Sequence, residues 1–213
     1  MKKLGIVEGF YGGSLNFHDR NSIVELLSKN SLNYYLYAPK EDPFLRNHLD
    51  LDPTPDWQSS FNDFVDLSSS HKVTIGVGLA PIDKKHAIEL NKKIELFMSL
   101  GVSNFSLLFD DIDQEFSLSE QVEILNRTKS SFNDISFDFC PTVYCSELIN
   151  KDKNHQDYFD EFCSIFPKDE KFFWTGDAVI SKSINKQCEK VLESFDKSNI
   201  CIWDNYFTVD SSP

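Results

Sequence analysis

Seven short apolar runs recur along the 213-residue chain, and the start of each lies 28 to 40 residues after the start of the one before. A short apolar run is typical of a buried strand, and each interval has room for one helix and two loops. This rhythm predicts parallel strands that alternate with helices. The predicted strands are 4–7, 33–37, 73–77, 105–109, 135–139, 172–174 and 200–203.

The segments between these runs carry helical signals. Gly101 is a candidate C-terminal stop for one helix, and Ser117 with Glu120 has the spacing of a capping box that opens another. A further helix is predicted over 184–195. Apolar residues at helical spacing are Ile23, Leu26 and Leu27 in the first interval and Leu90, Ile94, Phe97 and Met98 in the third.

Seven regular βα units favour a TIM-type (β/α)8 barrel over an open doubly wound sheet, because no Gly-rich phosphate loop follows the first run. A complete barrel of eight strands typically takes about 250 residues. The chain ends soon after its seventh strand, so we expect the eighth strand to be missing or replaced. No linker or repeat marks a second domain, and residues 1–213 are predicted to form a single, C-terminally short barrel.

The composition restricts the partners. A formal charge of −13 opposes binding to nucleic acid or to an anionic membrane. No stretch approaches the roughly 20 apolar residues of a membrane span, and Glu8 interrupts the first apolar run too early for a signal peptide. Five cysteines, an odd number, suit a reducing compartment. We therefore expect a cytoplasmic protein.

Polar residues follow the predicted strands, where the reactive groups of a parallel barrel collect. Carboxylates, an amine, an amide and aromatics on one rim suit a polyhydroxylated ligand and proton transfer. This set predicts sugar chemistry. Its members are Glu8 and Gly9; Lys40, Glu41 and Asp42; Pro81 and Asp83; Asp110 and Asp111; Pro141 and Tyr144; Thr175, Gly176 and Asp177; Asp204, Asn205 and Asp210.

Asp110 and Asp111 give the strongest local signal, since an apolar strand delivers two adjacent carboxylates to the rim. Crowding two carboxylates raises the proton affinity of one of them, which could then act as an acid. The alternative is a helix cap or a solvated charged turn.

A metal site is not predicted. Asp111, Asp113 and Glu115 alternate as in a calcium loop, but Phe116 stands where that loop needs glycine and Val122 where it needs glutamate. Cys140 and Cys145 lack a second pair at zinc-site spacing and are expected to be buried thiols. No cofactor is predicted.

Six blocks in order resemble the O-GlcNAcase family of β-N-acetylglucosaminidases, also called hyaluronidase-like glycosidases. The resemblance spans residues 4 to 210 and implies a TIM-type barrel and a glycoside hydrolase. The blocks are GIVEGFYG at 5–12, YLYAPKED at 35–42, LFDDID at 108–113, FCPTVYC at 139–145, WTG at 174–176 and IWDN at 202–205.

The resemblance implies removal of terminal β-linked N-acetylglucosamine by a retaining mechanism in which the substrate's own acetamide is the nucleophile and forms an oxazoline. By position, Asp110 would accept a hydrogen bond from the acetamide N–H. Asp111 would protonate the leaving oxygen and then activate water, so its pKa should lie above about 3.9.

The resemblance also implies a set of substrate-binding residues. Tyr144 would donate to the acetamide oxygen, and Trp203 would wall the acetyl pocket. The alternatives are core packing for both aromatics, a rim salt bridge for Lys40 and an ordinary turn at 204–205. The residues that match sugar-binding positions are Gly9 through its backbone, Lys40, Asn205 and Asp210; Asp42, Arg46 and Trp174 would shape the barrel mouth.

The expected partner is an N-acetylglucosamine-containing glycan or glycoprotein. A rival hypothesis is an N-acetylglucosamine-binding or interaction module that derives from the same family and has lost turnover together with its last strand. The open barrel edge also leaves room for a partner chain or an oligomer that covers it.

Overall fold

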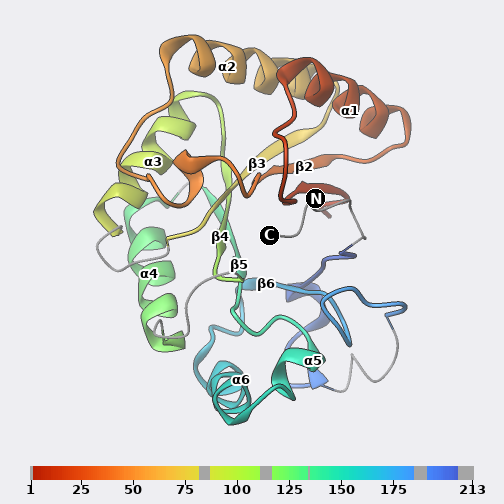
Figure 1. Ribbon diagram of the computed structural model, residues 1–213, viewed down its shortest axis with the longest axis vertical. Helices are drawn as coiled ribbons and strands as arrows, with labels where there is room; N and C mark the ends of the chain where they lie inside the picture. Colours follow the sequence, from red (N-terminus) through yellow and green to blue (C-terminus); the bar gives the residue numbers. More distant parts are fainter. Residues whose placement is uncertain (1, 82–86, 111–116, 134, 185–190, 206–213) are drawn as a thin grey trace. The chain divides into compact units, whose positions relative to one another are not determined.

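The computed structural model describes residues 2–81, 87–110, 117–133, 135–184 and 191–205, and strands alternate with helices along it (Figure 1). All seven predicted strands are confirmed, with bounds that shift by at most two residues. They are β1 (Gly5–Glu8), β2 (Tyr34–Tyr37), β3 (Thr74–Leu79), β4 (Asn104–Leu108), β5 (Ser136–Cys140), β6 (Lys171–Trp174) and β7 (Ile200–Ile202).

The helices fall between the strands, as the rhythm predicts. Those of ten residues or more are α1 (Phe17–Lys29), α2 (Pro55–Ser70), α3 (Ala87–Ser99), α4 (Leu118–Ser131) and α6 (Lys153–Ile165); the shorter ones are η1 (Pro43–Leu45), α5 (Ser146–Ile149) and η3 (Lys197–Asn199). Among the described helices, none combines the length and the apolar character that a membrane crossing requires.

The strands follow one another in the sheet in chain order, from β1 to β7. A doubly wound sheet reverses its strand order at a switch point, and this order contains no such reversal. It is the order of a TIM-type barrel, of which the described residues hold seven strands. Strands β1, β2 and β3 pair in parallel, as do β5, β6 and β7, so within each of these groups the carboxyl ends lie at the same edge.

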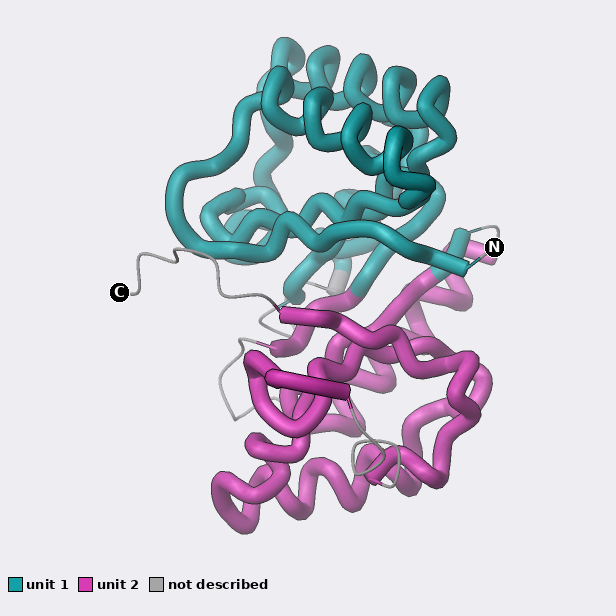
Figure 2. Tube along the Cα trace, turned by 90° about the vertical axis from the view of Figure 1, so that its right-hand side faces the viewer, with its two compact units in different colours: residues 1–106, 134–136, 210–213 teal, residues 107–133, 137–209 magenta. Residues whose placement is uncertain are grey.

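The chain divides into two compact units (Figure 2). Unit 1 comprises residues 1–106, 134–136 and 210–213, and unit 2 comprises residues 107–133 and 137–209. The single domain over 1–213 stays a prediction.

In unit 1, helix α2 packs on β2 through aromatic side chains. Tyr35 and Tyr37 are two positions apart in the strand, so both rings lie on the same face of the sheet. The Tyr35 ring lies 5.5 Å from that of Phe64, and the Tyr37 ring lies 5.4 Å from that of Phe61, both edge to face. This geometry is favourable for aromatic pairs and fixes α2 on the sheet.

The buried face of α1 differs from the prediction. Leu26 is 60% exposed, whereas Arg20, Val24 and Leu27 are buried. These three residues lie at positions i, i+4 and i+7, so the helix is rotated to bury an arginine in place of a leucine. The reason is a buried ionic partner for Arg20, which is described below.

In unit 2, a cluster of phenylalanines joins α6 to the sheet. Phe162 of α6 stacks on Phe166 with 4.6 Å between ring centroids and meets Phe172 of β6 edge to face at 5.1 Å. Phe195 lies 4.8 Å from Phe172. Several of the chain's 19 phenylalanines therefore form one core under α6.

Two of the predicted helix boundaries are confirmed. Ser117 caps α4 and forms the capping box with Glu120, and Gly101 follows α3 with a φ of 92°, in the region that favours glycine. In α3, Met98 is 37% exposed while Leu90, Ile94 and Phe97 are buried, so the apolar face is narrower than predicted. Much of the helix predicted over 184–195 lies outside the described residues.

Candidate active site

A ladder of backbone hydrogen bonds ties together the carboxyl ends of β4, β5, β6 and β7, all within unit 2. Each donor is the first residue after a strand, and the acceptors are the last residues of β5 and β6 and, for the second rung, Tyr144 in the loop after β5. The loops that follow these strands are therefore joined side by side. The rungs join the Phe109 N–H to the Cys140 carbonyl (2.9 Å), the Thr175 N–H to the Tyr144 carbonyl (3.0 Å) and the Trp203 N–H to the Trp174 carbonyl (2.9 Å).

Asp110 stands directly after the first rung and is half-buried. It therefore lies at the edge that the ladder defines. Asp111 lies outside the described residues, as do Asp113, Glu115 and Phe116 of the calcium-like segment that begins there. The raised pKa expected for Asp111 stays a prediction.

Tyr144 lies in the loop between β5 and α5, half-buried between the buried Val143 and Cys145. Cys145 pairs with Gly176 in an isolated parallel bridge, which extends the contact between β5 and β6 beyond the strands. Gly176 has a φ of 108°, and a Cβ on it would lie 2.6 Å from Ser181 Oγ, so glycine is required there. The Tyr144 loop is thus fixed to the segment that follows β6.

Trp203 and Asn205 follow β7, and both are half-buried. The Trp203 ring meets the Phe173 ring edge to face at 5.7 Å, so one part of the indole packs on the sheet while another part is accessible. Asp204 between them is exposed. Asp210 lies outside the described residues.

Gly9 and Lys40 belong to unit 1, at the carboxyl ends of β1 and β2. The Ala38 N–H donates to the Glu8 carbonyl at 3.1 Å, and the Lys40 N–H donates to the Phe10 carbonyl at 3.4 Å. These bonds hold the two loops against each other, so the backbone of Gly9 and the half-buried Lys40 are neighbours along this edge.

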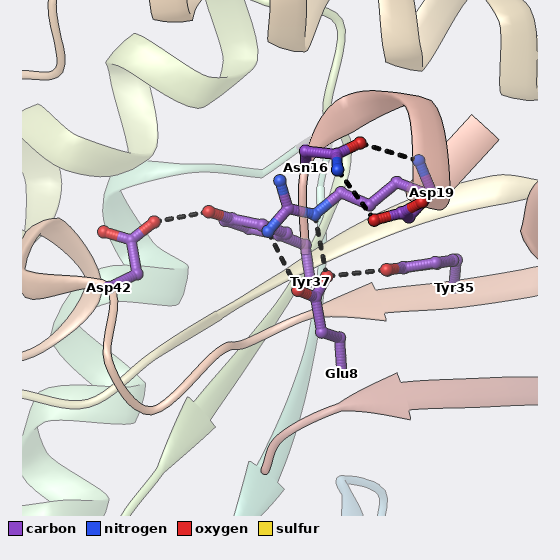
Figure 3. Close-up of polar contacts among 7 residues, drawn as sticks. Glu8, Asn16, Asp19, Tyr35, Tyr37 and Asp42 are labelled. Atoms are coloured by element: carbon purple, nitrogen blue, oxygen red, sulfur yellow. Dashed lines mark hydrogen bonds and ion pairs between the residues drawn. The ribbon is translucent and has the colours of Figure 1, made fainter. Parts of the chain in front are cut away.

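Glu8 is not a rim residue, contrary to the sequence expectation. Its side chain is 1% exposed, and its carboxylate accepts from Arg20 Nε at 3.0 Å and from the second guanidinium nitrogen at 2.9 Å (Figure 3). Tyr35 donates a third hydrogen bond, of 2.6 Å. A buried carboxylate must be paired, so Glu8 points between strand and helix instead of towards the rim.

This cluster has a clear electrostatic consequence. Burial and the adjacent Glu8 carboxylate both raise the pKa of Tyr35 well above its ordinary value, so the phenol stays a neutral donor. Sequence reasoning missed the cluster, although the spacing of Arg20, Val24 and Leu27 on one helical face could have indicated it.

Asp42 has a role in holding its own loop. It accepts a hydrogen bond from the hydroxyl of Tyr37 (Figure 3). It also accepts one at 2.9 Å from the N–H of Phe44, which caps η1. Burial raises the pKa of Asp42 in spite of these hydrogen bonds. Lys40 lies two residues before Asp42, so this contact fixes the end of the segment that carries it.

Of the other predicted mouth residues, Trp174 is fully buried and packs on Phe159 of α6 at 5.7 Å, and Arg46 is half-buried. Their role in shaping the mouth stays a prediction. Cys140 and Cys145 are fully buried free thiols, as expected. A search of the described residues finds no group of three His, Cys, Asp or Glu side chains placed to hold a metal ion.

Comparison with known proteins agrees with this arrangement. The family model for beta-N-acetylglucosaminidase matches residues 4–213. The Protein O-GlcNAcase of Mus musculus is 27% identical over 224 residues, which cover 97% of this chain and 24% of the mouse protein. The Protein O-GlcNAcase of Rattus norvegicus matches with the same identity and coverage.

Two solved structures are similar to the chain. A mutant of the O-GlcNAc hydrolase of Thermobaculum terrenum superimposes with a TM-score of 0.83 at 25% identity, over 96% of this chain and 48% of that one. CpGH84B gives a TM-score of 0.82 at 25% identity, over 91% of this chain and 37% of that one. These likenesses confirm the TIM-type fold class.

The chain spans about a quarter of the length of the curated relatives, namely 24%. The family model nevertheless covers nearly every residue, from the first strand to the last residue of the chain. On that match, the chain belongs to the beta-N-acetylglucosaminidase family.

Proposed function

We propose that this chain removes terminal β-linked N-acetylglucosamine from a glycan or glycoprotein. The observation that supports this most directly is the backbone ladder of unit 2, because it draws together the strand ends that carry Asp110, Tyr144 and Trp203. Relatives named for O-GlcNAc hydrolysis support the same substrate class. Attachment of the sugar to a protein, and a cytoplasmic location, are parts of the proposal.

The proposed reaction is retaining and substrate-assisted. In the first step the acetamide oxygen forms a bond to the anomeric carbon while the bond from that carbon to the leaving oxygen breaks. Asp111 gives its proton to the leaving oxygen, and the sugar becomes an oxazoline. In the second step water adds to the anomeric carbon, the oxazoline C–O bond breaks, and Asp111 takes up a proton from the water.

Two residues of unit 2 are assigned to the acetamide. Asp110 accepts a hydrogen bond from the acetamide N–H, and its negative charge stabilises the positive charge that develops on the oxazoline. Tyr144 donates to the acetamide oxygen and aligns it with the anomeric carbon, which lowers the entropic cost of reaching the reactive geometry. Half-burial of both side chains suits groups that must meet a ligand.

The remaining contacts are assigned to the acetyl group and to the sugar hydroxyls. Trp203 offers the accessible part of its indole to the acetyl group, as an apolar wall. Hydroxyl groups are assigned to Lys40, Asn205, Asp210 and the backbone of Gly9.

The test is Asp111→Asn in the 213-residue chain, assayed on aryl β-N-acetylglucosaminides of graded leaving-group pKa. An amide cannot supply the proton, so turnover of poor leaving groups should fall by about a hundredfold or more while activated aryl groups are affected less. Asp169→Asn is the matched control, since it removes an exposed carboxylate just before β6, at the opposite end of that strand. Equal loss across all leaving groups would contradict the assignment.

The rival hypothesis of a sugar-binding module without turnover predicts a different outcome. Titration of the same protein with N-acetylglucosamine would then give saturable binding, while no aryl glycoside is cleaved. Cleavage at a rate that falls in Asp111→Asn excludes that rival.

A further inference from the structure

Three residues from separate segments of unit 2 form a closed ring of hydrogen bonds. Tyr158 of α6 donates its hydroxyl proton to Gln121 Oε1 at 2.7 Å. Gln121 of α4 donates from Nε2 to Thr142 Oγ1 at 2.9 Å. The Thr142 backbone N–H donates to the hydroxyl oxygen of Tyr158 at 3.0 Å, which closes the ring.

Burial and the protonation state of Tyr158 both stabilise this ring. Gln121 is 0% exposed, and Tyr158 and Thr142 are half-buried. Burial raises the pKa of Tyr158 far above its ordinary value, so the phenol keeps its proton and its donor role. A buried polar group that loses its hydrogen-bond partner destabilises the folded state, so the three residues hold one another in place.

The ring anchors the loop between β5 and α5 at one end. Thr142 is the second residue after β5, and Tyr144 follows two residues later. The other end of the same loop is anchored to the segment after β6, through the 3.0 Å bond from the Thr175 N–H to the Tyr144 carbonyl. Tyr144 is thus held on one side by the side-chain ring at Thr142 and on the other side by its own backbone carbonyl.

Gln121 also connects this loop to α4, the helix that follows Asp110 in the chain. It lies one residue after Glu120 of the capping box that opens α4. That helix is the first described element after Asp110. One amide therefore joins the loop that carries Tyr144 to the start of the helix that follows the predicted catalytic pair.

We infer that Gln121 and Tyr158 are positioning residues that hold the Tyr144 loop so that the Tyr144 hydroxyl meets the acetamide oxygen of the substrate. The inference rests on the proposed function. Neither residue contacts the sugar; both act through Thr142. Loss of the ring removes the side-chain anchor of the loop at Thr142, and Tyr144 then loses part of the fixed geometry on which acetamide recognition depends.

The test is a double-mutant cycle between Tyr158→Phe and Tyr144→Phe, with dissociation constants measured for N-acetylglucosamine and for glucose, which lacks the acetamide. Tyr158→Phe should weaken binding of N-acetylglucosamine about three- to tenfold, the scale of one neutral hydrogen bond, and leave glucose binding unchanged. In the Tyr144→Phe background the same change should have no further effect.

Two substitutions of Thr142 test the same inference even if Tyr158→Phe fails to fold. Thr142→Ser keeps the hydroxyl that accepts from Gln121 and should bind as the unsubstituted protein does. Thr142→Val removes that hydroxyl at nearly equal volume and should reproduce the loss seen in Tyr158→Phe. A general loss of stability would weaken the binding of both sugars alike.

The outcomes separate this inference from the proposed function. If Tyr144→Phe weakens N-acetylglucosamine binding but Tyr158→Phe and Thr142→Val do not, or if the two phenylalanine changes are additive, the positioning role is wrong and the proposed function stands. If the unsubstituted protein shows no preference for N-acetylglucosamine over glucose, the proposed function itself is overturned.

Discussion

Arg20 and Glu8 form a two-point ion pair between α1 and β1, with both nitrogen-to-oxygen distances at or below 3.0 Å (Figure 3). Both side chains are almost completely buried. The guanidinium also lies over the ring of Tyr37, 4.9 Å from its centroid. The pair therefore ties the first helix to the first two strands and fixes the end of β1, immediately before Gly9.

Replacement of Arg20 by methionine should destabilise the protein strongly. The substitution fills similar volume but leaves the Glu8 carboxylate buried without its cation, a change that costs about 3–5 kcal/mol in comparable pairs. The measurement is the free energy of unfolding in urea. The double variant Arg20→Met, Glu8→Gln removes the orphaned charge and should be more stable than Arg20→Met alone. A loss below about 1 kcal/mol would show that water reaches Glu8.

Asp42 should make the stability of unit 1 depend on pH. Burial raises its folded-state pKa above the ordinary value of about 3.9, so the folded protein holds a proton that the unfolded chain has released. The stabilisation of the folded state that this proton gives is complete below about pH 3.9. It is lost as the pH rises through the pKa of Asp42 in the folded protein.

Asp42→Asn cannot titrate and so isolates this contribution. The free energy of unfolding of the unsubstituted protein, minus that of the variant, should decrease as the pH rises from about 4 and become constant above the folded pKa. Urea unfolding of both proteins between pH 4 and 7 provides the measurement. A difference that stays constant or grows over this range contradicts the assignment.

The capping box at the start of α4 should contribute a modest, local stability. The Ser117 N–H donates to Glu120 Oε2 at 3.0 Å, and Ser117 Oγ accepts from the Glu120 N–H at 3.4 Å. Because the second bond is long, Ser117→Ala should cost about 0.5–1 kcal/mol, the lower part of the range for N-caps. Ser130→Ala in the same helix is the control and should be nearly neutral in urea unfolding, since its hydroxyl only accompanies an existing helical bond to Asn126.

Strands β2 to β6 could be predicted from the sequence because they are buried on both faces, which requires a short continuous run of apolar residues. The order of the strands could be predicted because each interval has room for one helix. The side of α1 that is buried could not, because an apolar count ranks Leu26 above Arg20. That ranking holds only when the charge has no buried partner, and Glu8 supplies one. The same pair explains why Glu8 was wrongly expected at the rim.

The candidate site was predicted in part. A position after a strand indicates which residues reach the carboxyl edge, so Asp110 and Tyr144 could be named in this way. Trp203 was named only through the resemblance to the family. What holds them could not be named, because Gln121, Thr142 and Tyr158 lie 16 to 37 residues apart and no local pattern relates them. The predictions for Asp111 and Asp210 remain untested, since both lie outside the described residues.

Substrate assistance makes a prediction that concerns the ligand instead of the protein. If the acyl oxygen on the 2-amine attacks the anomeric carbon, electron withdrawal from that acyl group weakens the nucleophile and slows the chemical step. A series of aryl glycosides that carry acetyl, fluoroacetyl, difluoroacetyl and trifluoroacetyl groups should therefore show a steady fall in kcat. Steric bulk changes little along this series, so the trend reports electron density at the oxygen.

Replacement of Asp110 should lower kcat across this series, because Asp110 is proposed to accept a hydrogen bond from the amide N–H while the acyl oxygen attacks the anomeric carbon. Asp110→Asn removes the negative charge that stabilises the oxazoline, so kcat for the acetyl substrate should fall by about a hundredfold or more. The fluorinated substrates have a more acidic N–H. The ratio of kcat in the unsubstituted protein to kcat in Asp110→Asn, measured for each of them, shows how the effect of the Asp110 charge depends on the amide. A kcat that is independent of fluorination in the unsubstituted protein contradicts assistance by the substrate and points to a nucleophile supplied by the enzyme.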